Sequence, residues 1–122
     1  MYPPIFATCV AEAGVTALLG TVPTRLYLFG EAPQNVAKPY AVWQTITGSP
    51  ENYIGTLPDI DSYVIQIDVY ADSASSSRAV AEAIRDAVEP AAHVTSWGAE
   101  DRDPSTNNYR LNFTIDWWVA RT

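Results

Sequence analysis

The sequence predicts an α+β fold, with a mostly antiparallel sheet of four to five strands and two helices packed on one face. Two observations lead to this prediction. Residues 63–70 and 109–119 alternate between two sets of side chains, which is the period of a half-buried antiparallel strand. Residues 80–88 repeat apolar side chains every three to four positions, which is the period of a helix with one buried face.

A single domain is expected to span residues 1–122, because no repeat, linker or low-complexity tract divides the chain. Hydrophobic residues make up 48% of the sequence, which is enough to fill one core and argues against disorder. No apolar run approaches the ~20 residues that span a bilayer, so we expect a soluble protein without a membrane partner. The first residues contain no export signal, which favours folding in the cytosol.

The net charge of −7 arises from fourteen acidic side chains against seven basic ones. The basic side chains are scattered along the chain, which argues against specific binding to nucleic-acid phosphates. The acidity either keeps the protein soluble or repels a polyanion, as the wall of a channel for DNA would. The sequence leaves both interpretations open.

The first segment predicts a helix that starts at Pro3-Pro4, since proline fits the first turn of a helix. Apolar side chains recur at helical spacing from residue 6 to residue 17. We expect a break near Gly14 and one more short turn before Gly20.

Three strands are expected next, at residues 25–29, 39–48 and 63–70, with loops at 32–38 and 49–62. Pro39 suits the first residue of a strand, where its missing N–H costs least. The loop at 49–62 is far longer than a hairpin requires, which suggests that it has a function of its own.

The second half of the chain begins with a helix that runs from the capping residues Asp72-Ser73 to Pro90. Arg78 and Arg85 in this helix each lie four residues before a glutamate, on the expected solvent side. A weaker strand at 93–98, a polar loop at 99–108 and a last strand at 109–119 are expected to follow.

Catalysis is not expected, because the side chains that supply a nucleophile and a base are scarce and scattered. Cys9, beside the apolar side of the first helix, suits a small buried side chain better than a nucleophile. One alternative remains, a small enzyme or ligand-binding domain with an acid-lined site made by Asp59, Asp61 and His93. No cofactor motif is present.

Glu100, Asp101, Arg102 and Asp103 form the densest charge cluster. Carboxylates alternating in a loop can bind Mg²⁺ or Ca²⁺. Here the glycine and the closing glutamate of a calcium loop are missing and Arg102 interrupts the carboxylates, so we expect a solvated loop or a contact made by salt bridges.

Two groups of apolar side chains predict contacts with partners. Loops are usually polar, yet the loop at 49–62 contains Tyr53, Ile54, Leu57 and Ile60, which either fold back on the core or meet another chain. Trp43, Tyr70 and Trp118 are expected on the outward face of the sheet among polar side chains, and aromatic residues in a polar surround are typical of an interface.

An ordered series of segments along the chain resembles the tail completion proteins of long-tailed bacteriophages. The segments are VTALLG at 15–20, RLY at 25–27, APQ at 32–34, PYAVW at 39–43, GSPE at 48–51, QIDVYA at 66–71 and AVAEAIR at 79–85. A polar loop at Glu100-Asp101 and the strand at 109–118 complete the series, which covers nearly the whole chain.

The resemblance implies a structural virion protein that forms a ring, typically of six subunits, at the head-proximal end of the tail tube. Such a ring ends tube polymerisation, meets the neck or head-closure proteins, and lets DNA pass through its centre without specific binding. A different ring-forming component, a head-closure or tail tube subunit, is the alternative. The resemblance implies no catalytic residues and no cofactor.

Overall fold

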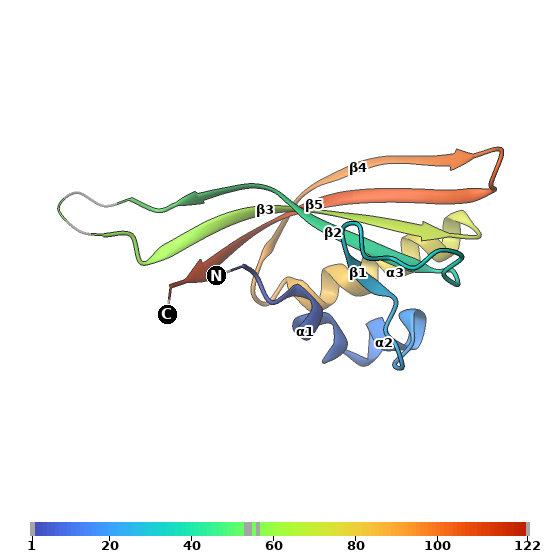
Figure 1. Ribbon diagram of the computed structural model, residues 1–122, viewed down its shortest axis with the longest axis horizontal. Helices are drawn as coiled ribbons and strands as arrows, with labels where there is room; N and C mark the ends of the chain where they lie inside the picture. Colours follow the sequence, from blue (N-terminus) through green and yellow to red (C-terminus); the bar gives the residue numbers. More distant parts are fainter. Residues whose placement is uncertain (1, 53–54, 56, 122) are drawn as a thin grey trace.

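The computed structural model describes residues 2–52, 55 and 57–121. Three helices and five strands are formed by these residues (Figure 1). In chain order they are α1 (Ile5–Val10), α2 (Ala13–Leu19), β1 (Leu26–Leu28), β2 (Tyr40–Pro50), β3 (Ile60–Ala71), α3 (Ala74–Val88), β4 (His93–Asp103) and β5 (Asn108–Ala120).

All five strands form one sheet in the order β1-β2-β3-β5-β4. β1 runs parallel to β2, and every other neighbouring pair is antiparallel. The three helices lie together on one side of the sheet, and no described element covers the other side (Figure 1). The predicted α+β fold is confirmed, with three helices in place of two.

The core lies between the helices and the covered face of the sheet. Its sheet side confirms the predicted alternation, since every second residue from Ile65 to Ala71 in β3 and from Leu111 to Trp117 in β5 is buried and the residues between them are more exposed. The side chains without measurable exposure include Ile5, Cys9, Leu19, Ile65, Ile67, Val69, Ile84, Val88, Phe113 and Ile115. Each of the three helices therefore contributes to the core, and the apolar stripe of α3 is buried as predicted.

The first helical segment breaks at Ala11-Glu12, before the predicted position at Gly14. The reason is that Glu12 adopts an extended backbone and its carbonyl oxygen accepts hydrogen bonds from the N–H groups of Val15 and Thr16. Glu12 therefore starts α2, and Gly14 lies inside it.

α3 begins as predicted, because the hydroxyl of Ser73 accepts a hydrogen bond from the backbone N–H of Ser76 at 3.1 Å. The two arginines of the helix bond partners other than the glutamates four residues ahead. Arg78 donates two hydrogen bonds to Glu100 of β4, and Arg85 bonds its neighbour Asp86. The exposed side of α3 is thus tied to the edge of the sheet.

The prediction of a polar loop at 99–108 is wrong. β4 extends to Asp103 and β5 begins at Asn108, so that only a four-residue turn at 104–107 connects them. The error arises because this part of β4 is exposed on both faces, and a strand that buries no side chain leaves no hydrophobic period in its sequence.

β2 and β3 also extend further than predicted, to Pro50 and from Ile60. The described residues of the hairpin at 48–63, here called the arm, project past the helices at one end of the molecule (Figure 1). The β4–β5 hairpin projects at the opposite end (Figure 1). The sequence did not predict these ends of β2 and β3, because no described helix covers them and their side chains need not alternate between apolar and polar.

Candidate partner interface

The arm presents part of the apolar group that the sequence singled out. The side chain of Leu57 is 88% exposed, and Ile60 is half-buried in β3 opposite Ala120. Tyr53 and Ile54 lie outside the described residues. Of the two predicted apolar residues of the arm that the structure describes, Leu57 is therefore the one whose side chain is free to contact a partner.

The base of the arm is fastened to the end of β5. Arg121 donates hydrogen bonds from Nε and Nη2 to the carboxylate of Asp61 at 3.0 and 2.8 Å, and its backbone N–H bonds the carbonyl oxygen of Asp59. Trp118 donates from its indole Nε1 to Glu51 at 3.1 Å. The hydrogen bonds from Arg121 lower the pKa of Asp61.

These bonds already engage one carboxylate of the acid-site alternative. Asp61 is held in an ion pair with Arg121, and His93 is an exposed residue whose ring packs edge-on against Trp118 at 5.7 Å. The described residues contain no group of three or more side chains placed to bind a metal ion. Burial raises the pKa of Cys9 to about 12, so its thiol stays protonated at neutral pH.

The uncovered face of the sheet is polar and carries a half-buried ion pair. Arg110 donates from Nη2 to Asp68 at 3.0 Å, and Gln66 donates to the same carboxylate. The rings of Tyr40 and Tyr70 stack beside this pair with centroids 5.0 Å apart. Asp68 is only 9% exposed although no described element covers it, because Arg110 and Gln66 on the same face bond its carboxylate.

Of the three aromatic residues predicted on this face, two lie there. Tyr70 faces Arg110 across the sheet, and Trp118 is 45% exposed near the base of the arm. The placement of Trp43 is wrong, since it pairs with Ile67 and packs against the core on the covered face. The alternation predicted within β2 holds from Tyr40 to Thr45, and the register then shifts by one residue before Thr47. The sequence did not tell which side of the strand the helices cover.

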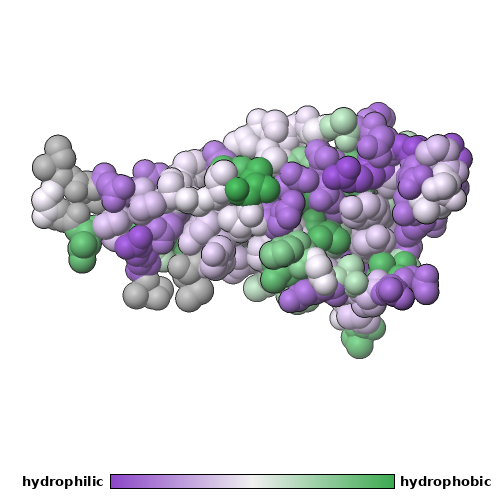
Figure 2. Space-filling model, turned by 45° about the horizontal axis from the view of Figure 1, so that its top comes forward, coloured by the Kyte–Doolittle hydropathy of each residue, from purple (hydrophilic) through white to green (hydrophobic). Residues whose placement is uncertain are grey.

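The acidic cluster of β4 is divided between the two faces of its strand. Glu100 points to the helix side and binds Arg78, whose hydrogen bond lowers the Glu100 pKa. Asp101 lies opposite Arg110, on the uncovered side. Arg102 bonds Asn107 and lies over the ring of Tyr109, while Asp103 accepts two hydrogen bonds from Ser105 in the turn. These contacts favour the salt-bridging interpretation over a metal site. Hydrophilic residues dominate this end of the surface (Figure 2).

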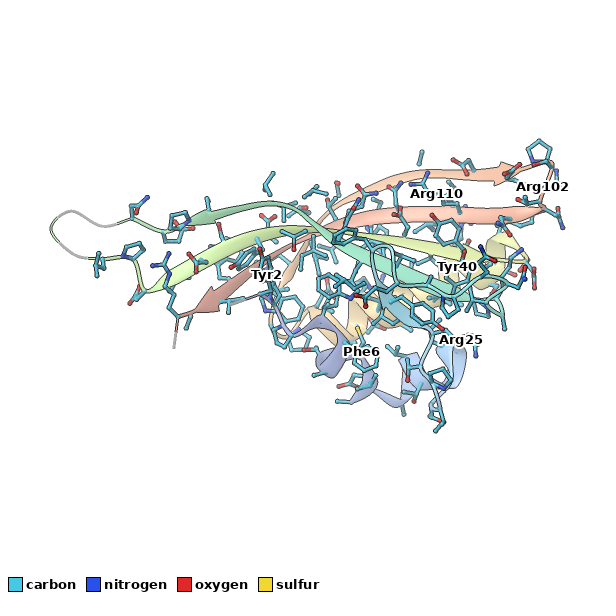
Figure 3. All side chains as sticks on the ribbon, in the orientation of Figure 1. Tyr2, Phe6, Arg25, Tyr40, Arg102 and Arg110 are labelled. Carbon is cyan, nitrogen blue, oxygen red and sulfur yellow. The ribbon has the colours of Figure 1, made fainter. Side chains whose placement is uncertain are left out.

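An apolar groove beside β2 was missed by sequence reasoning. It has a volume of about 470 Å³ and is lined mainly by Tyr2, Leu28, Phe29, Trp43 and Ile46. Phe29 and Ile46 are 59% and 44% exposed, and Tyr2 packs on Tyr63 (Figure 3). The apolar run at 25–29 was the signal, but β1 ends at Leu28 and leaves Phe29 at the surface.

Comparisons with known proteins give one family and one fold. The model of the family described as "Tail completion protein gp17" matches residues 3–120. A chain of a solved structure titled "Virion of native gene transfer agent (GTA) particle" is similar in fold, with a TM-score of 0.69 and 16% sequence identity over 95% of this chain and 91% of that chain. No curated protein matches the sequence significantly. None of the described helices has the length and apolar character to cross a membrane.

Proposed function

The chain belongs to the tail completion protein gp17 family and is a structural component of a phage-type tail; within that role, we propose that it forms a ring, of six subunits, at the head-proximal end of the tail tube. The ring ends growth of the tube and joins the tail to the neck or head-closure protein. DNA passes through the ring without specific binding. The match of the family model to residues 3–120 carries this proposal.

The distribution of surfaces supports a role in assembly. The arm and the β4–β5 hairpin project at opposite ends of the molecule, which gives one subunit two separate places to reach neighbours (Figure 1). Leu57 on the arm is 88% exposed, and an apolar side chain at such a position gains free energy when a partner removes it from water. The arm residues, Tyr53 and Ile54 included, are our proposed contact with a neighbouring subunit or the tube.

The uncovered face of the sheet is our candidate for the wall of the channel. Asp68, Asp101 and Asp116 occupy register positions on it, and the charge of Arg110 is already paired with Asp68. A wall with excess negative charge repels DNA phosphates, so that DNA slides without sticking. Tyr70 and Trp118 on the same face are proposed contacts near the channel or with the next subunit.

Tails assembled without this protein provide the test. We expect tubes of irregular length that fail to join filled heads, and addition of the purified protein should restore one ring at one end of each tube. Averaged electron micrographs give the position and symmetry of the ring, and quantitative mass spectrometry gives its copies per tail.

Four results would each contradict the proposal or a part of it. Many stacked copies per tail indicate a tube subunit, and a ring that stays with the head in the absence of tails indicates a head-closure protein. A protein that remains monomeric at every concentration and does not bind tails excludes the ring altogether. A predominantly basic channel wall excludes the assignment of the uncovered face.

A further inference from the structure

Two edges of the sheet are open in the described part of the chain. β1 pairs with β2 only from Ala41 to Trp43, and the N–H of Phe29 makes the last bond, to the carbonyl oxygen of Trp43. No described strand pairs with that side of β2 from residue 44 to residue 50. The outer side of β4 is likewise unpaired, and every residue of β4 except Val94 is exposed. Open edges offer backbone N–H and C=O groups to another strand.

One stretch of each edge lacks the charges that normally keep open strands apart, although the rest of β4, at residues 100–103, is charged. Residues 44–50 read QTITGSP and residues 93–99 read HVTSWGA, with no lysine, arginine, aspartate or glutamate in either stretch. Natural edges are commonly protected by lysine or by an inward-pointing charge. In a chain of net charge −7, two uncharged stretches are also the places where like-charged copies approach with least repulsion.

The two edges match on the covered face of the sheet. Trp97 of β4 lies opposite Phe113, with ring centroids 5.0 Å apart, and is still 50% exposed. The apolar groove beside the open part of β2 lies on the same face, since Trp43 in its wall pairs with Ile67 of the core. An exposed indole on one edge and an apolar groove on the other form a complementary pair.

We propose that β4 of one copy adds to the open edge of β2 in the next copy and places its Trp97 in the apolar groove. This inference rests on the ring proposed above. The two edges lie on opposite sides of the sheet, so the contact is head-to-tail and repeats around a closed ring.

The strand directions fit this arrangement. β4 runs opposite to β2 within one copy, because three antiparallel pairings separate them. Rotation about the axis of a ring preserves strand direction and keeps the helix-covered face on the same side. β4 of one copy is therefore antiparallel to β2 of the neighbouring copy, and its Trp97 lies on the helix-covered face, where the groove is. The open part of β2 lies toward the arm and β4 toward the other end, so neighbouring copies are staggered, as strands are in a closed barrel (Figure 1).

Cysteine pairs test the contact directly. Ser96→Cys is combined with Gln44→Cys, Thr47→Cys or Ser49→Cys, because these three side chains share the uncovered face with Ser96 and the register between copies is one of these positions. Paired Cα atoms about 4.4–6.8 Å apart allow a disulfide. On tails and under oxidation, we expect at least one combination to give a ladder of linked copies that ends at the size of the ring. Ser96→Cys with Ser75→Cys, on the first turn of α3, is the matched control and should stay unlinked.

A charge in the groove provides a second, independent measurement. Ile46→Glu should leave the isolated subunit folded, since this side chain is 44% exposed, and should lower the amount of linked or tail-bound ring at least tenfold. Val22→Glu is the matched control, because Val22 is 95% exposed and lies outside both edges. Far-ultraviolet circular dichroism and thermal unfolding verify the fold of each variant.

The outcomes separate this inference from the proposed function. If a ring forms on tails while all three cysteine pairs stay unlinked and Ile46→Glu assembles normally, the edge pairing is wrong and the ring stands. Links from Ser96→Cys to a tube subunit, in place of a ladder, also overturn the edge pairing. If the unmodified protein never forms a ring on tails, the proposed function fails, and the edge pairing with it.

Discussion

Arg121 holds Asp61 with two hydrogen bonds, from Nε to Oδ2 at 3.0 Å and from Nη2 to Oδ1 at 2.8 Å. This planar, two-bonded geometry fixes direction as well as distance. It joins the end of β5 to the start of β3, where the arm leaves the body of the sheet. The bond from Trp118 to Glu51 reaches the other strand of the arm, so both strands are attached to β5.

Asp61→Asn should loosen the base of the arm without unfolding the protein, because the neutral amide loses the charge-assisted bonds from Arg121. We expect faster hydrogen exchange of the backbone amides at 60–63 and 118–121, with unchanged exchange in α3. The matched control is Asp59→Asn, since the side chain of Asp59 is exposed and only its carbonyl oxygen binds Arg121. Equal exchange rates in both variants would show that the ion pair does not hold the arm.

Acid should weaken the fold through two of its carboxylates. Hydrogen bonds from arginines lower the pKa of Asp61 and of Glu100 below their ordinary values. Such groups bind fewer protons when folded, so their stabilisation is present above the unfolded pKa and is lost as the pH falls through the folded pKa. We expect the free energy of unfolding to fall below about pH 4. Urea unfolding at a series of pH values should show a shallower fall for Asp61→Asn with Glu100→Gln, and an unaltered fall in this double variant would contradict the assignment.

Phe113→Ala should lower the free energy of unfolding by about 3–5 kcal/mol, because it opens a cavity in a packed core. Phe113 has no measurable exposure and packs under Trp97. Urea unfolding gives the change, and Thr106→Ala in the exposed turn is the control, expected within about 0.5 kcal/mol of the unmodified protein. A loss below about 1 kcal/mol for Phe113→Ala would place the core elsewhere.

Cys9 should not react with thiol reagents while the protein is folded. Its side chain has no exposure, and burial raises the pKa of its thiol to about 12, so both access and the reactive thiolate are lacking. Labelling with a maleimide followed by mass spectrometry should show no adduct at neutral pH and full labelling in urea. An adduct on the folded protein would show that α1 opens readily.

Leu57→Asp should leave the isolated subunit as stable as the unmodified protein, since the side chain is 88% exposed. If the arm meets another chain, the new charge must lose water at the contact, and binding to tails should fall at least tenfold. Val22→Asp, at a side chain 95% exposed, is the control. Sedimentation of the protein with tails measures the binding, and normal binding of Leu57→Asp would exclude this side chain from the contact.

The strands and the helix that bury one face were predicted correctly, because their apolar side chains recur at a regular spacing. β3 and β5 alternate because one of their faces meets the helices, and α3 shows its stripe for the same reason. Prediction from the sequence failed at residues 99–103, which form an exposed edge strand, and at Trp43, whose face depends on where the helices pack. The groove beside β2 was missed because a strand that ends after three residues looks the same in sequence as one that continues.

The fold class, the main buried faces and the family resemblance could be predicted from the sequence, because apolar spacing and motif order are local properties of a chain. Which edges of the sheet stay open and which charged side chains meet is visible only once the chain is folded. Arg121 bonds Asp61, which lies 60 positions away in the sequence, and Arg78 bonds Glu100, although Glu82 is nearer in the sequence. Such contacts depend on strand register and helix placement, which are set when the whole core packs and leave no mark at the spacing of neighbouring residues.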